Sequence, residues 1–153
     1  MAAPLPPAQT ALKSDSFGRI LRVQGAQGPF VRRDLGATPW WLRGPAWWLA
    51  RREARALRHL HGMADVPQLL GWNGRWLDRS YMAGDAMYQR PPHGQVAWFH
   101  AARRLLQQLH RRGVAHNDLA KEANWLVTED GRPALIDFQL AVIGHPRSRW
   151  MRL

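Results

Sequence analysis

The sequence of 153 residues contains no cysteine, which excludes disulfide bonds and thiolate metal sites and is typical of a reducing compartment. It also has no stretch of about eighteen consecutive apolar residues, the length that a membrane-spanning helix requires. Residues 1–8 have neither a basic segment nor a long apolar run, so a signal peptide is not indicated. We therefore expect residues 1–10 to form a disordered tail. We expect the protein to be cytoplasmic, with the inner face of the membrane as a second location.

Lysine is scarce in this basic protein. Of the 22 basic residues, set against 11 acidic ones, all except Lys13 and Lys121 are arginine, and the formal net charge is +11. So basic a surface attracts polyanions such as nucleotides, nucleic acids or anionic lipids, although the codon usage of a GC-rich genome explains the arginines equally well. There is no helix-turn-helix, zinc-finger or RNA-recognition signature, so we expect no specific nucleic-acid partner.

The most informative part of the chain is a polar loop followed, after a hairpin, by the sequence Asp-Phe-Gln. Phosphoryl transfer from a magnesium nucleotide needs a group that orients the attacking hydroxyl, oxygen ligands for the metal, and cations near the phosphate charge. Asp118 suits the first role and Lys121 suits the third, so both are predicted catalytic residues. Asn124 and Asp137 suit the second role and are the predicted magnesium ligands.

A predicted hairpin connects these two metal-ligand candidates. Residues 125–127 and 133–136 are short apolar runs typical of strands, and residues 128–132 between them contain an Asp-Gly turn signal. The hairpin folds Asn124 and Asp137 back to the same end, so the two side chains become candidate ligands of one cation.

The two motifs also carry a family resemblance. Residues 116–124 read H-N-D-L-A-K-E-A-N and residues 137–139 read D-F-Q. They resemble the catalytic loop H-R-D-L-x-x-x-N and the metal loop D-F-G of the protein-kinase-like superfamily. The second motif is more similar to that of small atypical bacterial kinases, the RIO-type and lipopolysaccharide-core sugar kinases. Because Asn124 lies one residue further from Asp118 than in the family pattern, we expect the loop to bulge.

This resemblance implies ATP and Mg²⁺ as cofactors, and it assigns nucleotide-binding residues upstream. Arg33 takes the place of the strand lysine in V-A-I-K, and Glu53 on the next predicted helix is its expected partner. The residues alone leave two alternatives: Arg33 is an exposed strand residue, and an exposed Glu53 pairs with Arg51, Arg52 or another surface arginine.

Two further segments are predicted to bind the nucleotide, because their order in the chain matches that of nucleotide-binding segments in kinases. Residues 14–18 stand where a kinase has its nucleotide-covering loop, although they include only one glycine. Tyr81 and Met82 follow a predicted hairpin that turns at Asn73-Gly74, where a kinase chain crosses between lobes and its backbone meets adenine. As isolated residues these two are ordinary apolar residues at the end of a strand.

The predicted elements give an α+β, protein-kinase-like, two-lobed fold. Residues 11–82 are expected to form a small lobe with an antiparallel sheet and helix C, and residues 83–153 a truncated, mainly helical lobe. In the long helix predicted over residues 94–112, the apolar stripe is Trp98, Phe99, Ala102, Leu105, Leu106 and Leu109. The sequence ends soon after Asp137, so it is either a truncated product or a reduced lobe with an exposed apolar underside.

Residues 40–52 combine four tryptophans with arginines and permit two interpretations. Indole rings and arginines suit a membrane interface, where the rings sit among lipid headgroups and the cations meet anionic lipid. The same rings also suit packing against the small lobe or against a partner element, which the sequence favours slightly.

Taken together, the motifs predict a kinase that moves the γ-phosphoryl group of Mg-ATP to a hydroxyl group. The resemblance allows a protein serine or threonine, a sugar or a lipid as the acceptor. The alternative is a pseudokinase, which would keep the fold and the nucleotide site as a binding module without catalysis. Arg33, the missing glycines and the lengthened loop favour that alternative.

Overall fold

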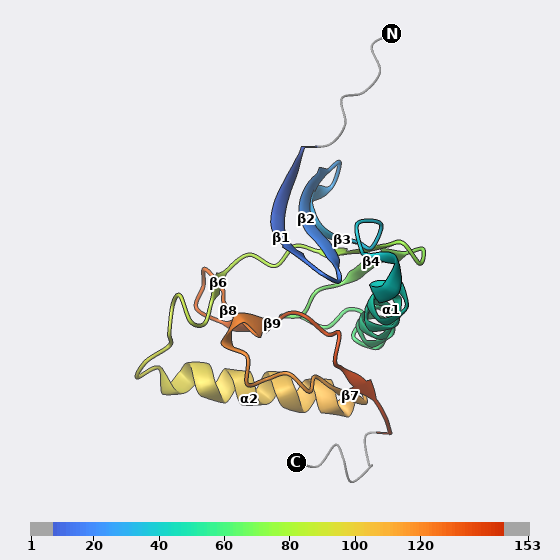
Figure 1. Ribbon diagram of the computed structural model, residues 1–153. Helices are drawn as coiled ribbons and strands as arrows, with labels where there is room; N and C mark the ends of the chain where they lie inside the picture. The colour runs from blue at the N-terminus through green and yellow to red at the C-terminus, as the bar shows by residue number, and fades with distance from the viewer. Residues whose placement is uncertain (1–7, 146–153) are drawn as a thin grey trace.

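A five-stranded antiparallel sheet forms the first part of the computed structural model, which describes residues 8–145 (Figure 1). The strand order is β1-β2-β3-β5-β4. The strands are β1 (Gln9–Asp15), β2 (Gly18–Gly25), β3 (Gly28–Asp34), β4 (Leu69–Trp72) and β5 (Trp76–Ser80). Short turns join the first three strands, so residues 14–18, expected to cover the nucleotide, form the tip of the β1–β2 hairpin.

One helix packs on this sheet. The 3-10 turn η1 (Trp40–Leu42) leads into α1 (Arg43–His59). Its buried side carries Ala46, Ala50 and Ala54, which are four residues apart and therefore lie in one row. These small side chains let the helix lie close to Leu35 and Leu77 of the sheet region, with which they form one hydrophobic core.

The second part of the chain is built around the helix α2 (Val96–Arg111), with a short hairpin beside it (Figure 1). Its other elements are β6 (Asp85–Ala86), β7 (Val114–Ala115), η2 (Glu122–Asn124), β8 (Trp125–Val127), β9 (Pro133–Leu135) and β10 (Val142–Ile143). Leu105 and Leu109 of α2 share a core with Phe138 and with Leu57 and Leu60 at the end of α1. This core joins the second part of the chain to the first.

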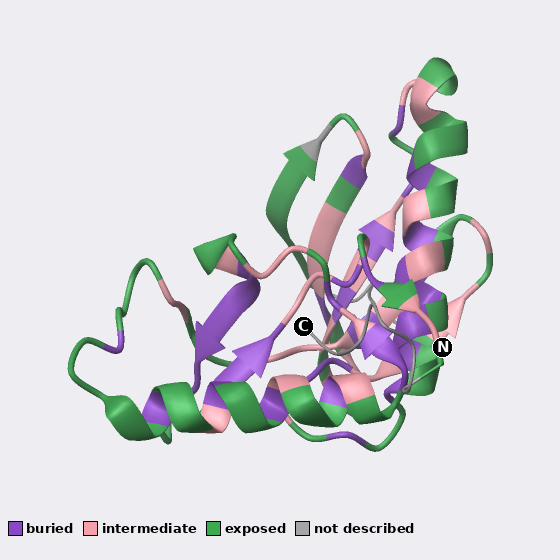
Figure 2. Ribbon diagram, turned by 90° about the horizontal axis from the view of Figure 1, so that it is seen from below, coloured by how far each residue is buried: buried purple, intermediate pink, exposed green. Residues whose placement is uncertain are grey.

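Burial along α2 corrects the predicted stripe. Figure 2 shows buried and exposed residues alternating along α2, and β8 and β9 are buried along their length. Trp98, Ala102, Leu105 and Leu109 are buried, but Phe99 is 55% exposed. Phe99 follows Trp98 directly and so turns about 100° away from it around the helix. Gly113 ends the helix with a positive φ of 74°, as its position in the sequence predicts.

The mixed α+β class with an antiparallel sheet is confirmed, but two details of the predicted fold are wrong. The described residues from 83 to 145 contain one α-helix and five short strands, so this part is not mainly helical. Gln9 and Thr10 belong to β1 and pair with β2, whereas residues 1–7 of the expected tail lie outside the described residues. The predicted hairpin that turns at Asn73-Gly74 is present as β4–β5: Gly74 has a positive φ of 87°, and the Asn73 side chain accepts hydrogen bonds from the backbone N–H groups of Arg75 and Trp76.

Candidate active site

A cavity of about 430 Å³ lies between the five-stranded sheet and the β8–β9 hairpin. Five residues that the sequence predicts for the site line it together: Tyr81, Met82, Lys121, Asn124 and Asp137. On one side, the cavity is lined by residues of every strand of the five-stranded sheet except β4. On the opposite side, it is lined by the segment around η2 and by the chain after β9. The predicted hinge, loop and metal motif therefore meet at one place.

The β8–β9 hairpin brings the two predicted metal ligands together. Trp125 pairs with Leu135 in the antiparallel register, and the backbone N–H of Ile136 donates to the carbonyl oxygen of Asn124 at 2.9 Å. Asp137 follows with a φ of 64°, a left-handed conformation that aspartate adopts more readily than most residues. Backbone strain of this kind costs roughly 1–3 kcal/mol and gathers at functional sites.

Asp118 lies beside the cavity and is held by Asn124. The Asn124 side-chain amide donates to the Asp118 carboxylate at 2.8 Å and to the Asp118 carbonyl oxygen at 3.0 Å. The turn η2 accommodates the extra residue of this loop, so Asn124 still returns to Asp118. Asp118 is half-buried and does not itself line the cavity, whereas the amide that fixes it does.

His116 connects this loop to the strand that precedes Asp137. Its Nε2 donates to the carbonyl oxygen of Ile136 at 2.9 Å, because its Nδ1 accepts from the backbone N–H of Asp118 at 3.3 Å. Both bonds are satisfied by the neutral ring. Burial lowers the pKa of His116, and the bond to Ile136 and the charges of Asp137 and Asp118 oppose that shift only in part. His116 is the first residue of the loop motif at 116–124, but no role was predicted for it from the sequence.

Glu53 of α1 is fully buried and pairs with two arginines. Arg33 Nε lies 3.6 Å from Oε2, which is the pair that the resemblance implies, and Arg79 Nη1 donates to Oε1. Arg33 and Arg79 are also buried, at 4% and 7% exposure. The alternatives of a surface Arg33, and of an exposed Glu53 paired with Arg51, Arg52 or another surface arginine, are therefore wrong.

Arg79 is the site residue that the sequence reasoning missed. It lines the cavity, while Arg33 does not, and Arg33 instead faces the side-chain amide of Gln139, whose oxygen accepts from the guanidinium once the amide is oriented with its oxygen toward it. Burial and the neighbouring charge of Arg33 lower the pKa of Arg79 to about 10, with Asp137 acting in the opposite direction. The burial of Arg79 could have been predicted from the sequence, because Arg79 is two residues after the buried Leu77 and so points to the same face of β5.

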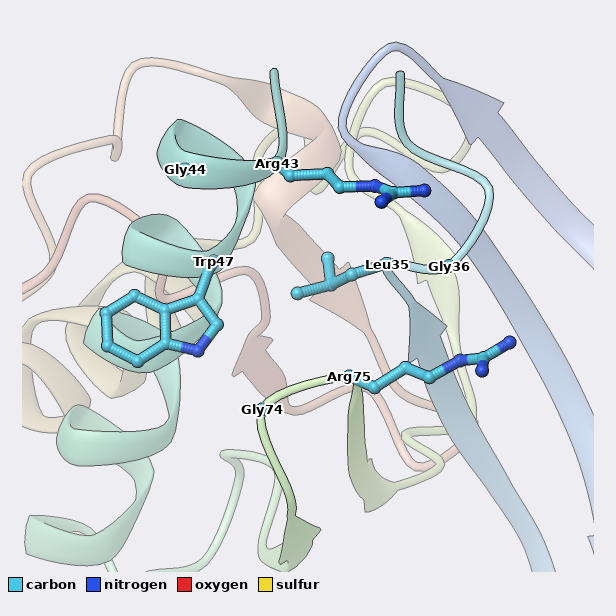
Figure 3. Close-up of a pocket in the computed structure, with 7 residues that line it drawn as sticks. All are labelled: Leu35, Gly36, Arg43, Gly44, Trp47, Gly74 and Arg75. Atoms are coloured by element: carbon cyan, nitrogen blue, oxygen red, sulfur yellow. The ribbon is translucent and has the colours of Figure 1, made fainter. Parts of the chain in front are cut away.

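A second hollow, of about 520 Å³, lies near the start of α1 (Figure 3). It shares no lining residue with the first cavity. Residues that directly follow β3, residues of α1 and residues of the β4–β5 turn line the second hollow. None of the residues predicted for nucleotide or metal binding is among them.

The donor set of the first cavity fits a metal ion that arrives with a nucleotide. Within residues 8–145, no group of three or more histidine, aspartate and glutamate side chains could hold a metal ion. Magnesium, however, is commonly held by one or two carboxylates together with substrate phosphates and water. The Asp137 carboxylate and the Asn124 amide oxygen supply oxygen donors of this kind in one cavity.

Comparison with known proteins agrees with this geometry. The model of the phosphotransferase enzyme family, APH, matches residues 6–148. None of the curated proteins compared with the chain matches it. Because the family model covers nearly the whole chain, the protein belongs to the phosphotransferase enzyme family, which is part of the protein-kinase-like superfamily.

Proposed function

We propose that this family member is a kinase that moves the γ-phosphoryl group of ATP to a hydroxyl group. Membership of the family supports phosphoryl transfer as the reaction. The observation that carries the proposal is the cavity in which the candidate hinge, the cation Lys121 and the oxygen donors Asn124 and Asp137 meet. No single segment of the chain supplies this set.

Each residue has a role in the proposed reaction. Asp118 orients the acceptor hydroxyl and takes its proton, and Lys121 offsets charge on the transferring group. Asn124 and Asp137 hold magnesium, which when bound neutralises charge on the nucleotide phosphates. The backbone around Tyr81 and Met82 meets the adenine ring.

The two buried arginines, Arg33 and Arg79, have different roles in this proposal. Arg33 is held by Glu53 and Gln139 behind the cavity, and Arg79 is the arginine that lines it. We therefore propose that Arg33 and Glu53 position Arg79, and that Arg79 shares with Arg33 the attraction to the α- and β-phosphates. Buried guanidinium groups are suited to this work because they stay protonated.

The proposal extends to the acceptor and the location. The Asp-Phe-Gln motif supports the narrower resemblance to RIO-type and lipopolysaccharide-core sugar kinases, so the acceptor is a hydroxyl group of a protein serine or threonine, a sugar or a lipid. Labelled ATP and Mg²⁺, added to a lysate fractionated into protein, lipid and polysaccharide, identify the acceptor class by the fraction that gains label. A cytoplasmic location is part of the proposal because ATP is supplied there.

Replacing Asp118 tests the catalytic assignment. General-base help contributes roughly 10²–10⁴-fold in rate, so Asp118→Asn should lower phosphoryl transfer by about that factor while the unfolding midpoint stays close to that of the wild type. Asp85→Asn is the matched control, since Asp85 is 61% exposed and lies in a strand outside the cavity. Equal transfer rates for wild type and Asp118→Asn would contradict the assignment.

A binding module without catalysis is the second candidate. It is favoured by Arg33, which replaces the usual lysine and does not line the cavity. ATP-dependent stabilisation without transfer to any lysate fraction and without ATP hydrolysis would select this candidate. Label in any fraction, lost in Asp118→Asn, selects the kinase.

A further inference from the structure

The start of α1 and the turn before it present a surface of tryptophan and arginine to solvent. Trp40 is 77% exposed, Trp41 63%, Trp47 41% and Trp48 51%. We call this surface the Trp–Arg face, and it comprises Trp40, Trp41, Trp47, Trp48, Arg51, Arg52 and Arg55. Trp47 lies against Trp72 of β4, with ring centres 6.5 Å apart, so the interpretation that the rings pack against the small lobe holds for this ring. Trp40 and Trp41 are too exposed for such packing.

Helical spacing places the α1 members of this face side by side. Trp47, Arg51 and Arg55 are four residues apart, as are Trp48 and Arg52, so they form neighbouring rows on the helix. The Arg51 guanidinium lies 5.3 Å from the centre of the Trp47 ring, and the Arg52 guanidinium lies 4.5 Å from that of Trp48. Arg52 also donates to the carbonyl oxygens of residues 140 and 141, which leaves Arg51 and Arg55 as the more exposed cations.

The face carries no negative charge of its own. Residues 35–52 include no aspartate or glutamate, and Glu53, the single acidic residue of α1, is fully buried. The formal net charge of the protein, +11, adds to the local excess of cations. A partner of matching chemistry is therefore anionic and accepts indole rings.

The second hollow borders this face and contributes two more arginines beside it. Trp47 lines the hollow together with Arg43 and Arg75, and in Figure 3 these two arginine side chains extend in the same direction, one on each side of Leu35. Arg75 is 66% exposed, and its Nε lies 3.8 Å from the Asp34 carboxylate. With about 520 Å³ of space, the hollow can receive a phosphate-bearing headgroup.

We propose that the Trp–Arg face docks on the surface of an anionic phospholipid bilayer. Indole rings are favoured at the depth of the lipid headgroups, and arginines near the surface are attracted to anionic lipid. Double-stranded nucleic acid would satisfy the arginines but would leave the protruding Trp40 and Trp41 rings in water. No member of the face lines the active-site cavity, so docking leaves that cavity accessible. The inference does not depend on the proposed kinase reaction.

Vesicle binding by the full chain tests this inference. Wild-type protein should sediment with vesicles of phosphatidylcholine and phosphatidylglycerol, and should not sediment with phosphatidylcholine alone. Each surface arginine contributes about fivefold in membrane affinity, so Arg51→Gln/Arg55→Gln should weaken binding roughly 25-fold. Trp40→Ala/Trp41→Ala should weaken it at least about tenfold, because the rings no longer enter the headgroup layer.

Two control variants match these changes on other surfaces. Arg103→Gln/Arg104→Gln removes the same charge from the exposed side of α2, and Tyr88→Ala/Phe99→Ala removes two exposed aromatic rings. Both should bind anionic vesicles within about twofold of wild type if one face makes the contact. Equal losses in face and control variants would overturn the proposal, as would no binding to anionic vesicles. Binding of a short DNA duplex as tightly as the vesicles, unchanged by Trp40→Ala/Trp41→Ala, would also overturn it.

Discussion

Burial and hydrogen bonding set the charge state of His116. The ring donates through Nε2 to Ile136 and accepts through Nδ1 from the backbone of Asp118, and it stacks edge-on against Phe138 with ring centres 4.7 Å apart. Protonating Nδ1 would break the bond to the Asp118 backbone and bury a charge. The histidine of the motif thus fixes the backbone beside both predicted carboxylates, and the neutral form is required for that.

The lowered pKa of His116 makes stability depend on pH. Its ordinary value is 6.5, and burial lowers the pKa in the folded state, so the unfolded chain binds more protons just below pH 6.5. The unfolding free energy should therefore fall as pH drops below about 6.5, and His116→Asn should remove this part of the slope. Urea unfolding of wild type and variant between pH 5 and pH 8 measures the difference. His93→Asn, at an exposed histidine, should keep the wild-type slope; a wild-type slope in His116→Asn would contradict the prediction.

At the scale of secondary-structure elements, Glu53 holds three of them together. The carboxylate projects from α1 and meets Arg33 of β3 and Arg79 of β5. Two buried guanidinium groups with one buried carboxylate leave a local excess of positive charge, which the nearby Asp137 reduces for Arg79. Removing the carboxylate would leave both cations buried and uncompensated.

We expect Glu53→Ala to be strongly destabilising. Breaking a buried ion pair by removing one partner costs roughly 3–5 kcal/mol of unfolding free energy. Asp78→Asn is the control, because it disrupts the Arg32–Asp78 pair, which is about one-fifth exposed on each side, and should cost about 0–1 kcal/mol. Chemical denaturation measures both variants. Similar losses for the two would mean that Glu53 is not the buried link between these elements.

At the scale of the whole molecule, the candidate active site belongs to neither part alone. The cavity has strands of the sheet on one side and the segments around Asn124 and Asp137 on the other. The larger hydrophobic core includes residues of both α1 and α2 and so fixes the two sides relative to one another. No helix of the described residues is long and apolar enough to cross a bilayer.

A ligand that contacts both sides of the cavity should stabilise the entire fold. At a concentration about 100 times its dissociation constant, ATP with Mg²⁺ should add about 2.7 kcal/mol to the unfolding free energy. For a chain of this size that corresponds to roughly 5–10 °C in the unfolding midpoint. Differential scanning fluorimetry with ATP alone, with Mg²⁺ alone and with both measures it.

The metal-dependent part of this shift has its own control. Asp137→Asn should lose the increment that Mg²⁺ adds to ATP, because a carboxylate ligand becomes neutral. Asp85→Asn, outside the cavity, should keep it. Equal shifts with and without Mg²⁺ in the wild type would contradict the assignment of Asn124 and Asp137 as metal ligands.

The sequence by itself determined the local features: the polar loop, the hairpin that returns Asn124 to the residue before Asp137, the helix end at Gly113 and the antiparallel strands. These follow from short-range geometry, because turn residues and apolar spacing act over a few positions of the chain. Only the tertiary structure decided that Arg79 joins Arg33 at Glu53, that Phe99 faces solvent while Trp98 is buried, and that the rings of residues 40 and 41 stay exposed. The physical reason is that burial and ion pairing depend on which distant elements pack together, and neighbouring residues in the sequence do not specify that.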